Sequence, residues 1–160
     1  MFKIIFLSII IVFAFVDSTC PDGTYVIPSI LGSNWPCMLL SNDTAIYTYA
    51  ERVCEEHNGH LLPIPNAFVD AFVADLIRIA NLSRPVGIGV TRLLGGIWRN
   101  VDDGTNTTYF NWGVEQPNNI TGCNCAYIYS NDIWAAGVCE NVNYYACGVP
   151  GTGETGFLSL

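Results

Sequence analysis

The sequence of 160 residues predicts one α+β domain, in which two helices pack on short strands and disulfide bonds join distant segments. Three observations lead to this prediction. Two segments with helical periodicity come first, and the half of the chain that follows them is rich in short strand-like segments and loops. Seven cysteines are spread along the chain, and all of them follow an apolar N-terminal segment.

The composition excludes one large class of function. The chain has 14 acidic residues against 6 basic residues, which gives a formal net charge of −8. The basic residues after Lys3 are five scattered arginines, whereas nucleic-acid binding needs clustered positive charge. Hydrophobic residues make up 51% of the chain, which is enough for a core. We therefore expect a folded domain with no nucleic-acid partner.

The first 18 residues are typical of a secretory signal peptide. Lys3 precedes the apolar run Ile4–Val16, and the small residue Ser18 follows it. The run is shorter than the roughly 20 residues that a membrane-spanning helix needs, so an uncleaved anchor is the less favoured alternative. We expect cleavage near Ser18 and a secreted, extracellular protein without a membrane span. Its domain then covers residues 19–150, and residues 151–160 form a flexible tail.

Two segments predict helices. The first is expected to begin at a cap formed by Asn42 or Asp43 and to end at Asn58-Gly59. The second is expected to begin from Asn66 and to end at Asn81. We interpret their apolar faces as core: Ala45, Tyr49, Val53 and Cys54 in the first helix, and Phe68, Val69, Phe72, Val73, Leu76 and Ile77 in the second.

The pattern changes after Pro85. A buried strand is predicted over 86–90, and further strands over 126–129, 133–135 and 144–149. Residues 100–124 are rich in Asn, Asp, Gly and Thr and show almost no periodicity. Because a loop of this length inside a compact domain is uncommon and usually functional, we expect it to carry the binding site.

The cysteines and sequons agree with export. In an oxidising compartment cysteines are more often in disulfides than in metal sites, but spacing alone does not fix their pairing. An odd count of seven leaves one thiol over. Four Asn-X-Ser/Thr sequons are expected to be exposed glycosylation sites, which makes the protein a predicted glycoprotein: Asn42, Asn81, Asn106 and Asn119.

Taken in order, the motifs from about Cys20 to Cys147 resemble the C-type lectin-like domain family. They are Cys20-Pro-Asp-Gly-Thr-Tyr with Cys37, Gly59-His-Leu-Leu-Pro-Ile64 after the first helix, Gly87-Ile-Gly-Val90, Asn111-Trp112 followed by Gln116-Pro117-Asn118, and the spacing of nine, five and eight residues between Cys125, Trp134, Cys139 and Cys147. The resemblance implies a C-type lectin-like fold of the long form, with two helices on small antiparallel sheets and a long irregular loop. It also implies a cis Pro117 and three disulfides: Cys20–Cys37, Cys54–Cys147 and Cys125–Cys139.

These pairs leave Cys123 unpaired. It is a free thiol, a bridge to a second chain, or a competitor of Cys125 for Cys139. An exposed free thiol is a liability outside the cell, which favours a disulfide-linked dimer through Cys123.

The resemblance also implies a calcium site with five side-chain positions, which here are Gln116, Asn118, Cys123, Ala135 and Ala136. Calcium takes six to eight oxygen ligands, and carboxylates make the site tight. Three of the five positions offer no oxygen, and the other two are neutral amides. We therefore expect no cofactor, and weak or no calcium dependence.

Other polar motifs have simpler interpretations. Asn131-Asp132 and Asp102-Asp103-Gly104 are alternative calcium ligands, but both are more typical of turns. Cys54, His57 and His60 have a metal-like spacing, yet a disulfide at Cys54 excludes a zinc thiolate. Glu51, Glu55 and Glu56 fit a solvated helix face. No arrangement of nucleophile and base suggests an enzyme.

Two functions remain. The resemblance implies a secreted lectin that binds carbohydrate through Gln116, Asn118 and Asn124, with Trp112 or Tyr109 stacking on a sugar ring. The alternative is a calcium-independent module that binds a protein ligand through the same loop. The Gln116-Pro117-Asn118 sequence without a full calcium site predicts neither a mannose nor a galactose preference.

Overall fold

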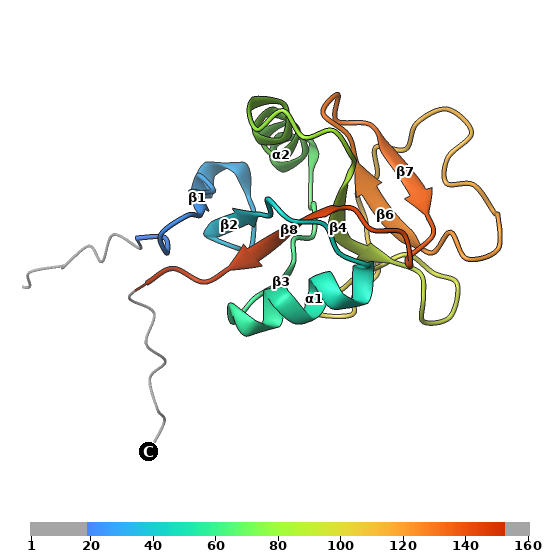
Figure 1. Cartoon of the computed structure of the whole chain (residues 1–160), viewed down its shortest axis with the longest axis horizontal. Helices are drawn as coiled ribbons and strands as arrows, with labels where there is room; N and C mark the ends of the chain where they lie inside the picture. The colour runs from blue at the N-terminus through green and yellow to red at the C-terminus, as the bar shows by residue number, and fades with distance from the viewer. Residues whose placement is uncertain (1–18, 153–160) are drawn as a thin grey trace, which may run out of the picture.

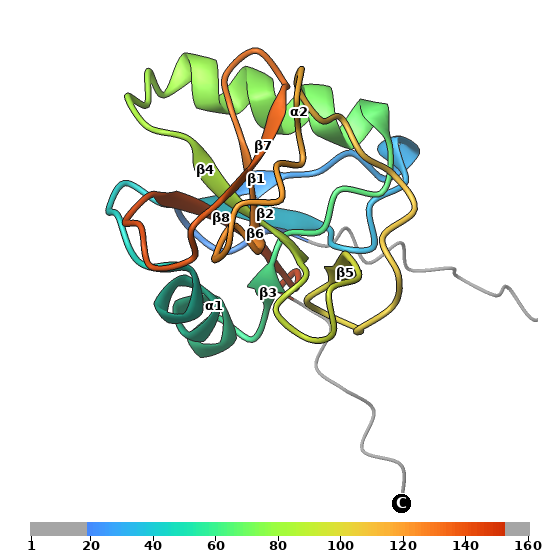
Figure 2. The same ribbon diagram turned by 90° about the vertical axis from the view of Figure 1, so that its right-hand side faces the viewer.

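The computed structural model describes residues 19–152. The expected signal peptide and residues 153–160 of the expected tail lie outside the described residues. The two ends of the described chain meet in a bridge between Thr19 and Thr152. Between them, a twisted sheet lies between two helices, with α2 on one side and α1 on the other (Figures 1 and 2). Neither described helix is long and apolar enough to cross a membrane.

The sheet has eight strands, with the order β1-β2-β8-β4-β6-β7 and with β3 beside β8 and β5 beside β4. The elements in chain order are β1 Tyr25–Val26, the 3-10 helix η1 Ser29–Leu31, β2 Cys37–Leu40, α1 Tyr47–Glu56, β3 His60–Leu61, α2 Ala67–Ile79, β4 Val86–Thr91, β5 Arg99–Asn100, β6 Cys125–Ile128, β7 Trp134–Gly137 and β8 Tyr144–Val149.

One strand pair departs from the expected small antiparallel sheets. β4 and β8 run parallel, with Val86 opposite Tyr144 and Gly87 opposite Tyr145. β8 also pairs antiparallel with β2 and with β3, so this strand joins the two halves of the sheet into one. The long chain segment between β4 and β8 permits the parallel crossover, because it does not have to turn directly.

The start predicted for the first helix is wrong. Ala45 forms backbone hydrogen bonds with Asn143 in an isolated bridge, which holds the chain extended up to Ile46, and α1 begins only at Tyr47. The buried face is therefore Tyr47, Ala50 and Cys54, whereas Tyr49 is 49% exposed. The predicted end is confirmed by Asn58, whose φ of 59° is left-handed.

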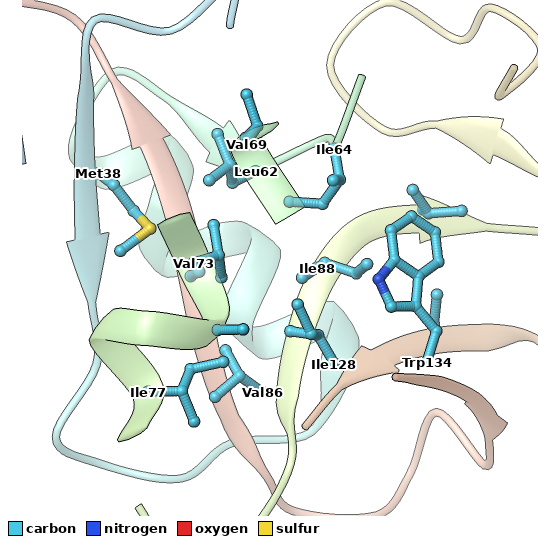
Figure 3. Packing of buried hydrophobic residues seen from close by; sticks show 14 of the residues in the cluster. Met38, Leu62, Ile64, Val69, Val73, Ile77, Val86, Ile88, Ile128 and Trp134 are labelled. Carbon is cyan, nitrogen blue, oxygen red and sulfur yellow. The ribbon is translucent and has the colours of Figure 1, made fainter. Parts of the chain in front are cut away.

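The second helix begins as predicted. The Asn66 side chain caps α2 by accepting hydrogen bonds from the N–H groups of Phe68 and Val69. Val69, Val73 and Ile77 point into the core (Figure 3). Phe68, which the periodicity placed on the core face, is 70% exposed, because the buried stripe continues through the carboxylate residue Asp70 instead.

The core lies on both faces of the sheet. Below α2, aliphatic side chains from β2, β4 and β6 pack with Trp134 of β7 (Figure 3). On the other face, between α1 and the sheet, Tyr47 and Leu61 pack against the buried disulfide cysteines. The three disulfides are Cys20–Cys37, Cys54–Cys147 and Cys125–Cys139, which confirms the pairs implied by the resemblance.

The long loop connects β5 to β6. Residues 101–124 contain no helix or named strand, as the sequence predicts, although Asn106 and Trp112 form single bridges with Arg99 and Trp134. In Figure 1 the loop extends at the right of the molecule, at the opposite end from β1. The bridge between Trp112 and Trp134 places the loop next to β7, the strand that contains Ala135 and Ala136.

Candidate functional site

A buried carboxylate fixes the first part of the long loop. Asp70 of α2 is 1% exposed, and its oxygens accept hydrogen bonds from three donors: Trp134 Nε1 at 2.7 Å, Tyr109 OH at 2.9 Å and Asn111 Nδ2 at 2.9 Å. Burial raises the pKa of Asp70, and the three hydrogen bonds act in the opposite direction. Asp70 thus joins α2, β7 and the loop at one point.

Five aromatic rings continue this attachment toward the surface. Trp112 lies between Trp98 and Trp134, with ring centres 4.8 Å and 5.6 Å away, and Phe110 stacks on it at 5.8 Å. Tyr109 packs edge-on against Trp134. The two rings that the sequence suggested for sugar stacking, Trp112 and Tyr109, are therefore engaged in packing the loop on the core.

The Gln116-Pro117-Asn118 segment is closed onto β7. The Gln116–Pro117 bond is cis. Gln116 Oε1 accepts hydrogen bonds from the N–H of Ala136 at 2.9 Å and from the N–H of Asn118 at 3.2 Å. Asn118 Nδ2 donates to the Ala136 carbonyl at 3.1 Å, while Asn118 Oδ1 accepts from the N–H of Ile120. Both amide oxygens are therefore used inside the protein.

The residues present do not fit a calcium ion at this site. A calcium site needs six to eight oxygens that are free to bind the ion, and carboxylates among them raise its affinity. The amide oxygens of Gln116 and Asn118 already accept backbone hydrogen bonds, and Ala135 and Ala136 supply no side-chain oxygen. Cys123, at the remaining position, is buried and also lacks one.

An arginine that the sequence analysis did not single out binds the second part of the loop. Arg92 follows β4 directly, and its guanidinium donates to four oxygens: Asn118 O at 2.9 Å, Asn119 Oδ1 at 3.2 Å, Cys123 O at 3.0 Å and Asn124 Oδ1 at 3.2 Å. The guanidinium also lies over the Trp98 ring, 5.0 Å from its centre. Arg92 thereby brings together Asn118 and Asn124, two of the three residues that the sequence proposed for ligand binding.

Cys123 is the free cysteine of the described chain, and it is only 6% exposed. Its N–H donates to Ile120 and its carbonyl accepts from Arg92, so the surrounding backbone is held in place. Cys125 and Cys139 pair with each other, which leaves no role for Cys123 as their competitor. A bridge from this sulfur to a second chain would require the loop to open first.

The remaining polar motifs have structural roles. Asp132 has a left-handed φ of 63° in the turn between β6 and β7. Asp102 accepts a hydrogen bond from Trp35 Nε1 at 3.1 Å. Hydrogen bonds from Thr105 lower the pKa of Asp103.

The histidine pattern in the first helix is not a zinc site, because Cys54 is in a disulfide. Glu51 accepts hydrogen bonds from the N–H of Leu61 at 2.8 Å and contacts His60 Nδ1 at 2.5 Å. This carboxylate, predicted as part of a solvated face, ties α1 to β3. The four sequon asparagines Asn42, Asn81, Asn106 and Asn119 are all exposed.

Two surface hollows are formed by elements that adjoin the loop. One, of about 300 Å³, is lined by residues of β6 and β7 together with Arg84 and Tyr129, among others. The other, of about 470 Å³, lies between α1 and the segment after β4 and is mostly apolar, with Leu93, Leu94 and Val101 on its wall. Neither contains Gln116, Asn118 or Asn124 in its lining.

Comparisons with known proteins agree with this geometry. Residues 43–149 match the family model of the lectin C-type domain. The sequence is 31% identical over 119 residues to asialoglycoprotein receptor 2 of Rattus norvegicus, an alignment that covers 69% of this chain and 38% of the receptor. The chain therefore spans well under half of the length of this relative.

Solved structures show the same fold. The mouse scavenger receptor C-type lectin carbohydrate-recognition domain superposes with a TM-score of 0.68 at 24% identity, covering 80% of this chain and 94% of that one. A calcium-independent type II antifreeze protein superposes with a TM-score of 0.69 at 21% identity, covering 83% and 95%.

Proposed function

Because the chain belongs to the lectin C-type domain family, we propose that it binds a carbohydrate through the surface of its long loop and that binding does not depend on calcium. The family is generally non-enzymatic. The solved neighbour that is named a carbohydrate-recognition domain supports the ligand class.

One observation carries the proposal. Gln116, Asn118 and Asn124 are half-buried at the surface, and hydrogen bonds to the protein itself fix all three. Within the described chain, Gln116 Nε2 and Asn124 Nδ2 have no hydrogen-bond partner, since only the oxygens of these amides are used. Two fixed donors of this kind suit the hydroxyl oxygens of a sugar, and they need no metal ion to hold them.

The proposed location is extracellular. The signal-like N-terminus, the three disulfides and the exposed sequons all support secretion as a glycoprotein. Asn119 lies beside Asn118, and its Oδ1 is held by Arg92. A glycan on Asn119 would leave this oxygen available and would extend from the edge of the proposed binding surface.

A protein ligand is the second candidate, and exposed apolar side chains favour it. Val114 is 95% exposed and Ile120 is 66% exposed, on either side of Gln116-Pro117-Asn118 in the loop. Exposed apolar side chains mark protein-interaction sites where they form one contiguous surface, which is the arrangement that this second candidate requires of Val114 and Ile120. The neighbour named a calcium-independent antifreeze protein supports a ligand other than a sugar on this fold.

The test is glycan-array binding of the secreted protein with and without a chelator. We expect binding that the chelator leaves unchanged. Gln116→Glu and Asn124→Asp keep a side-chain acceptor oxygen at each position but replace the free NH2 donor by a second carboxylate oxygen, so each variant should lose most of the signal. Asn131→Asp, in the exposed turn after β6, is the matched control and should bind normally.

The other outcomes separate the parts of the proposal. Binding that the chelator abolishes would contradict calcium independence. Equal binding by both donor variants and the wild type would contradict the assigned residues. A folded protein that binds no glycan but captures a protein through Val114 and Ile120 would establish the second candidate.

A further inference from the structure

The guanidinium of Arg92 has the contacts that a loop-bound metal ion would have. It is a positive charge surrounded by four oxygens of one loop, at 2.9 to 3.2 Å. Two of these are backbone carbonyls, of Asn118 and Cys123, and two are side-chain amide oxygens, of Asn119 and Asn124. No carboxylate is among them, so the charge of Arg92 is not used in an ion pair here.

The chemistry of this oxygen set favours a guanidinium over a metal ion. Neutral carbonyl and amide oxygens are weak calcium ligands without carboxylates to offset the cost of dehydration. A guanidinium is more weakly hydrated, and its five N–H donors lie in one plane, so it satisfies several oxygens spread around it. A lysine ammonium has three donors on one atom and does not span the same set.

We propose that Arg92 is the built-in cation of the long loop, and that it orders residues 118–124 in the way that calcium would order the corresponding loop of a metal-dependent relative. Arg92 is a positioning residue, because it acts through the loop and does not itself have to touch a ligand. The inference deepens the proposed function, but the order of the loop does not depend on whether the ligand is a glycan.

The position of Arg92 explains why one side chain is sufficient to order residues 118–124. Its guanidinium lies over Trp98, and Trp98 packs on Trp112, which packs on Trp134. Trp134 in turn donates to the buried Asp70. The loop is thereby attached to α2 and β7 through a continuous series of contacts from the surface to the core.

The use of an arginine in place of a metal ion predicts how the loop responds to pH and to calcium. An arginine side chain stays charged throughout the pH range in which proteins are folded, and it cannot be removed by a chelator. Residues 118–124 should therefore keep their structure in acid and at low calcium. A loop held by carboxylates and calcium loosens in acid because its ligands become protonated, and at low calcium because the ion dissociates.

Amide hydrogen exchange of the ligand-free protein tests the proposal, read at residues 119–124 and corrected for intrinsic rates. In Arg92→Gln these amides should exchange at least about tenfold faster than in the wild type, and Arg92→Lys should lie between the two. Arg99→Gln is the matched control, since Arg99 makes one side-chain hydrogen bond, to Gly104. Calcium and chelator should leave the wild-type rates unchanged.

Disulfide mapping of each variant shows whether it has folded, and the Arg92→Lys variant keeps the test valid if Arg92→Gln does not fold. Unchanged exchange at 119–124 in folded Arg92→Gln would overturn the proposal. So would faster exchange of the wild-type loop on removal of calcium. Neither result depends on a ligand, so a failed glycan array would contradict the proposed function alone.

Discussion

At the scale of single residues, two charged side chains hold the long loop in its observed shape. Asp70 is an acidic residue in the middle of an otherwise apolar helix face, and its oxygens accept hydrogen bonds from the buried Trp134 Nε1 and from the half-buried Tyr109 and Asn111. Arg92 has the opposite charge and binds the other part of the loop. The two side chains act on different segments, so we expect their effects on stability to be separable.

Asp70→Asn should lower the free energy of unfolding by about 2–3 kcal/mol, because an amide offers one acceptor oxygen where the carboxylate offers two, and its NH2 group would face either Trp134 Nε1 or the Tyr109 and Asn111 donors. Urea unfolding followed by tryptophan fluorescence measures this change. Asp75→Asn on the same helix is the control. Asp75 is exposed and pairs with Arg78, so its loss should change stability by less than about 0.5 kcal/mol. Equal effects of the two substitutions would contradict the role of Asp70.

Sequence reasoning predicted neither residue, for a physical reason in each case. The position of Asp70 fits the buried stripe of α2, but a charged residue there is assigned to the surface unless its donors are known. Those donors lie 39 to 64 residues away in the sequence. For Arg92 the signal was its isolation: a single arginine after a buried strand in an acidic chain. Its four acceptors become visible only when the loop is folded.

At the scale of elements, the sequence predicted a helix end well where the residues that determine this end lie next to it in the chain. Asn66 caps α2 as predicted, and Asn58 ends α1 in a left-handed conformation. The start of α1 was predicted wrongly because the bridge from Ala45 to Asn143 competes with helix formation, and its partner is almost 100 residues away in the chain. The loop was predicted from its lack of periodicity, but its internal contacts could not be.

Asn66→Ala should destabilise the protein by about 1 kcal/mol, since the first turn of α2 loses the oxygen that accepts from Phe68 and Val69. The Asn66 amide also donates to the Leu31 carbonyl at 2.9 Å. Asn66→Asp keeps the cap and loses only this donor, and therefore separates the two contributions. Thermal unfolding by circular dichroism measures both variants. A larger loss in Asn66→Asp than in Asn66→Ala would contradict the capping role.

At the scale of the whole molecule, one sheet and three disulfides hold a domain that leaves many residues in irregular structure. Cys54–Cys147 joins α1 to β8 across a separation of 93 residues. In the chain-entropy model a closure of this length stabilises the folded state by about 4–5 kcal/mol. The family resemblance implied the pairing and the layout, whereas the parallel contact between β4 and β8 was visible only in the structure.

The buried tyrosines predict how stability depends on alkaline pH. Burial raises the pKa of Tyr127 to about 12 and that of Tyr47 well above its usual value of 10. Below pH 10 both phenols are protonated in the folded and the unfolded chain, so they cause no pH dependence. Between about pH 10 and 12 the unfolded chain releases these protons first, and stability falls by up to about 1.4 kcal/mol per pH unit for each tyrosine.

Urea midpoints measured from pH 8 to pH 11.5 test this prediction. A Cys123→Ser background prevents thiolate exchange with the disulfides. Tyr127→Phe should make the fall above pH 10 less steep, and a substitution of the exposed Tyr129 by Phe controls for the loss of a phenol. A slope that does not change in Tyr127→Phe would contradict the burial of this phenol.

A calcium titration of the folded protein decides whether side chains take the place of a metal ion in the long loop. Extracellular calcium modules bind with a Kd of about 10⁻⁴–10⁻³ M, which titration calorimetry detects. If Arg92 and the loop amides replace the ion, the titration should give no saturable heat over this range and Tm should not rise with calcium. Saturable binding that Gln116→Ala and Asn118→Ala abolish would contradict this replacement.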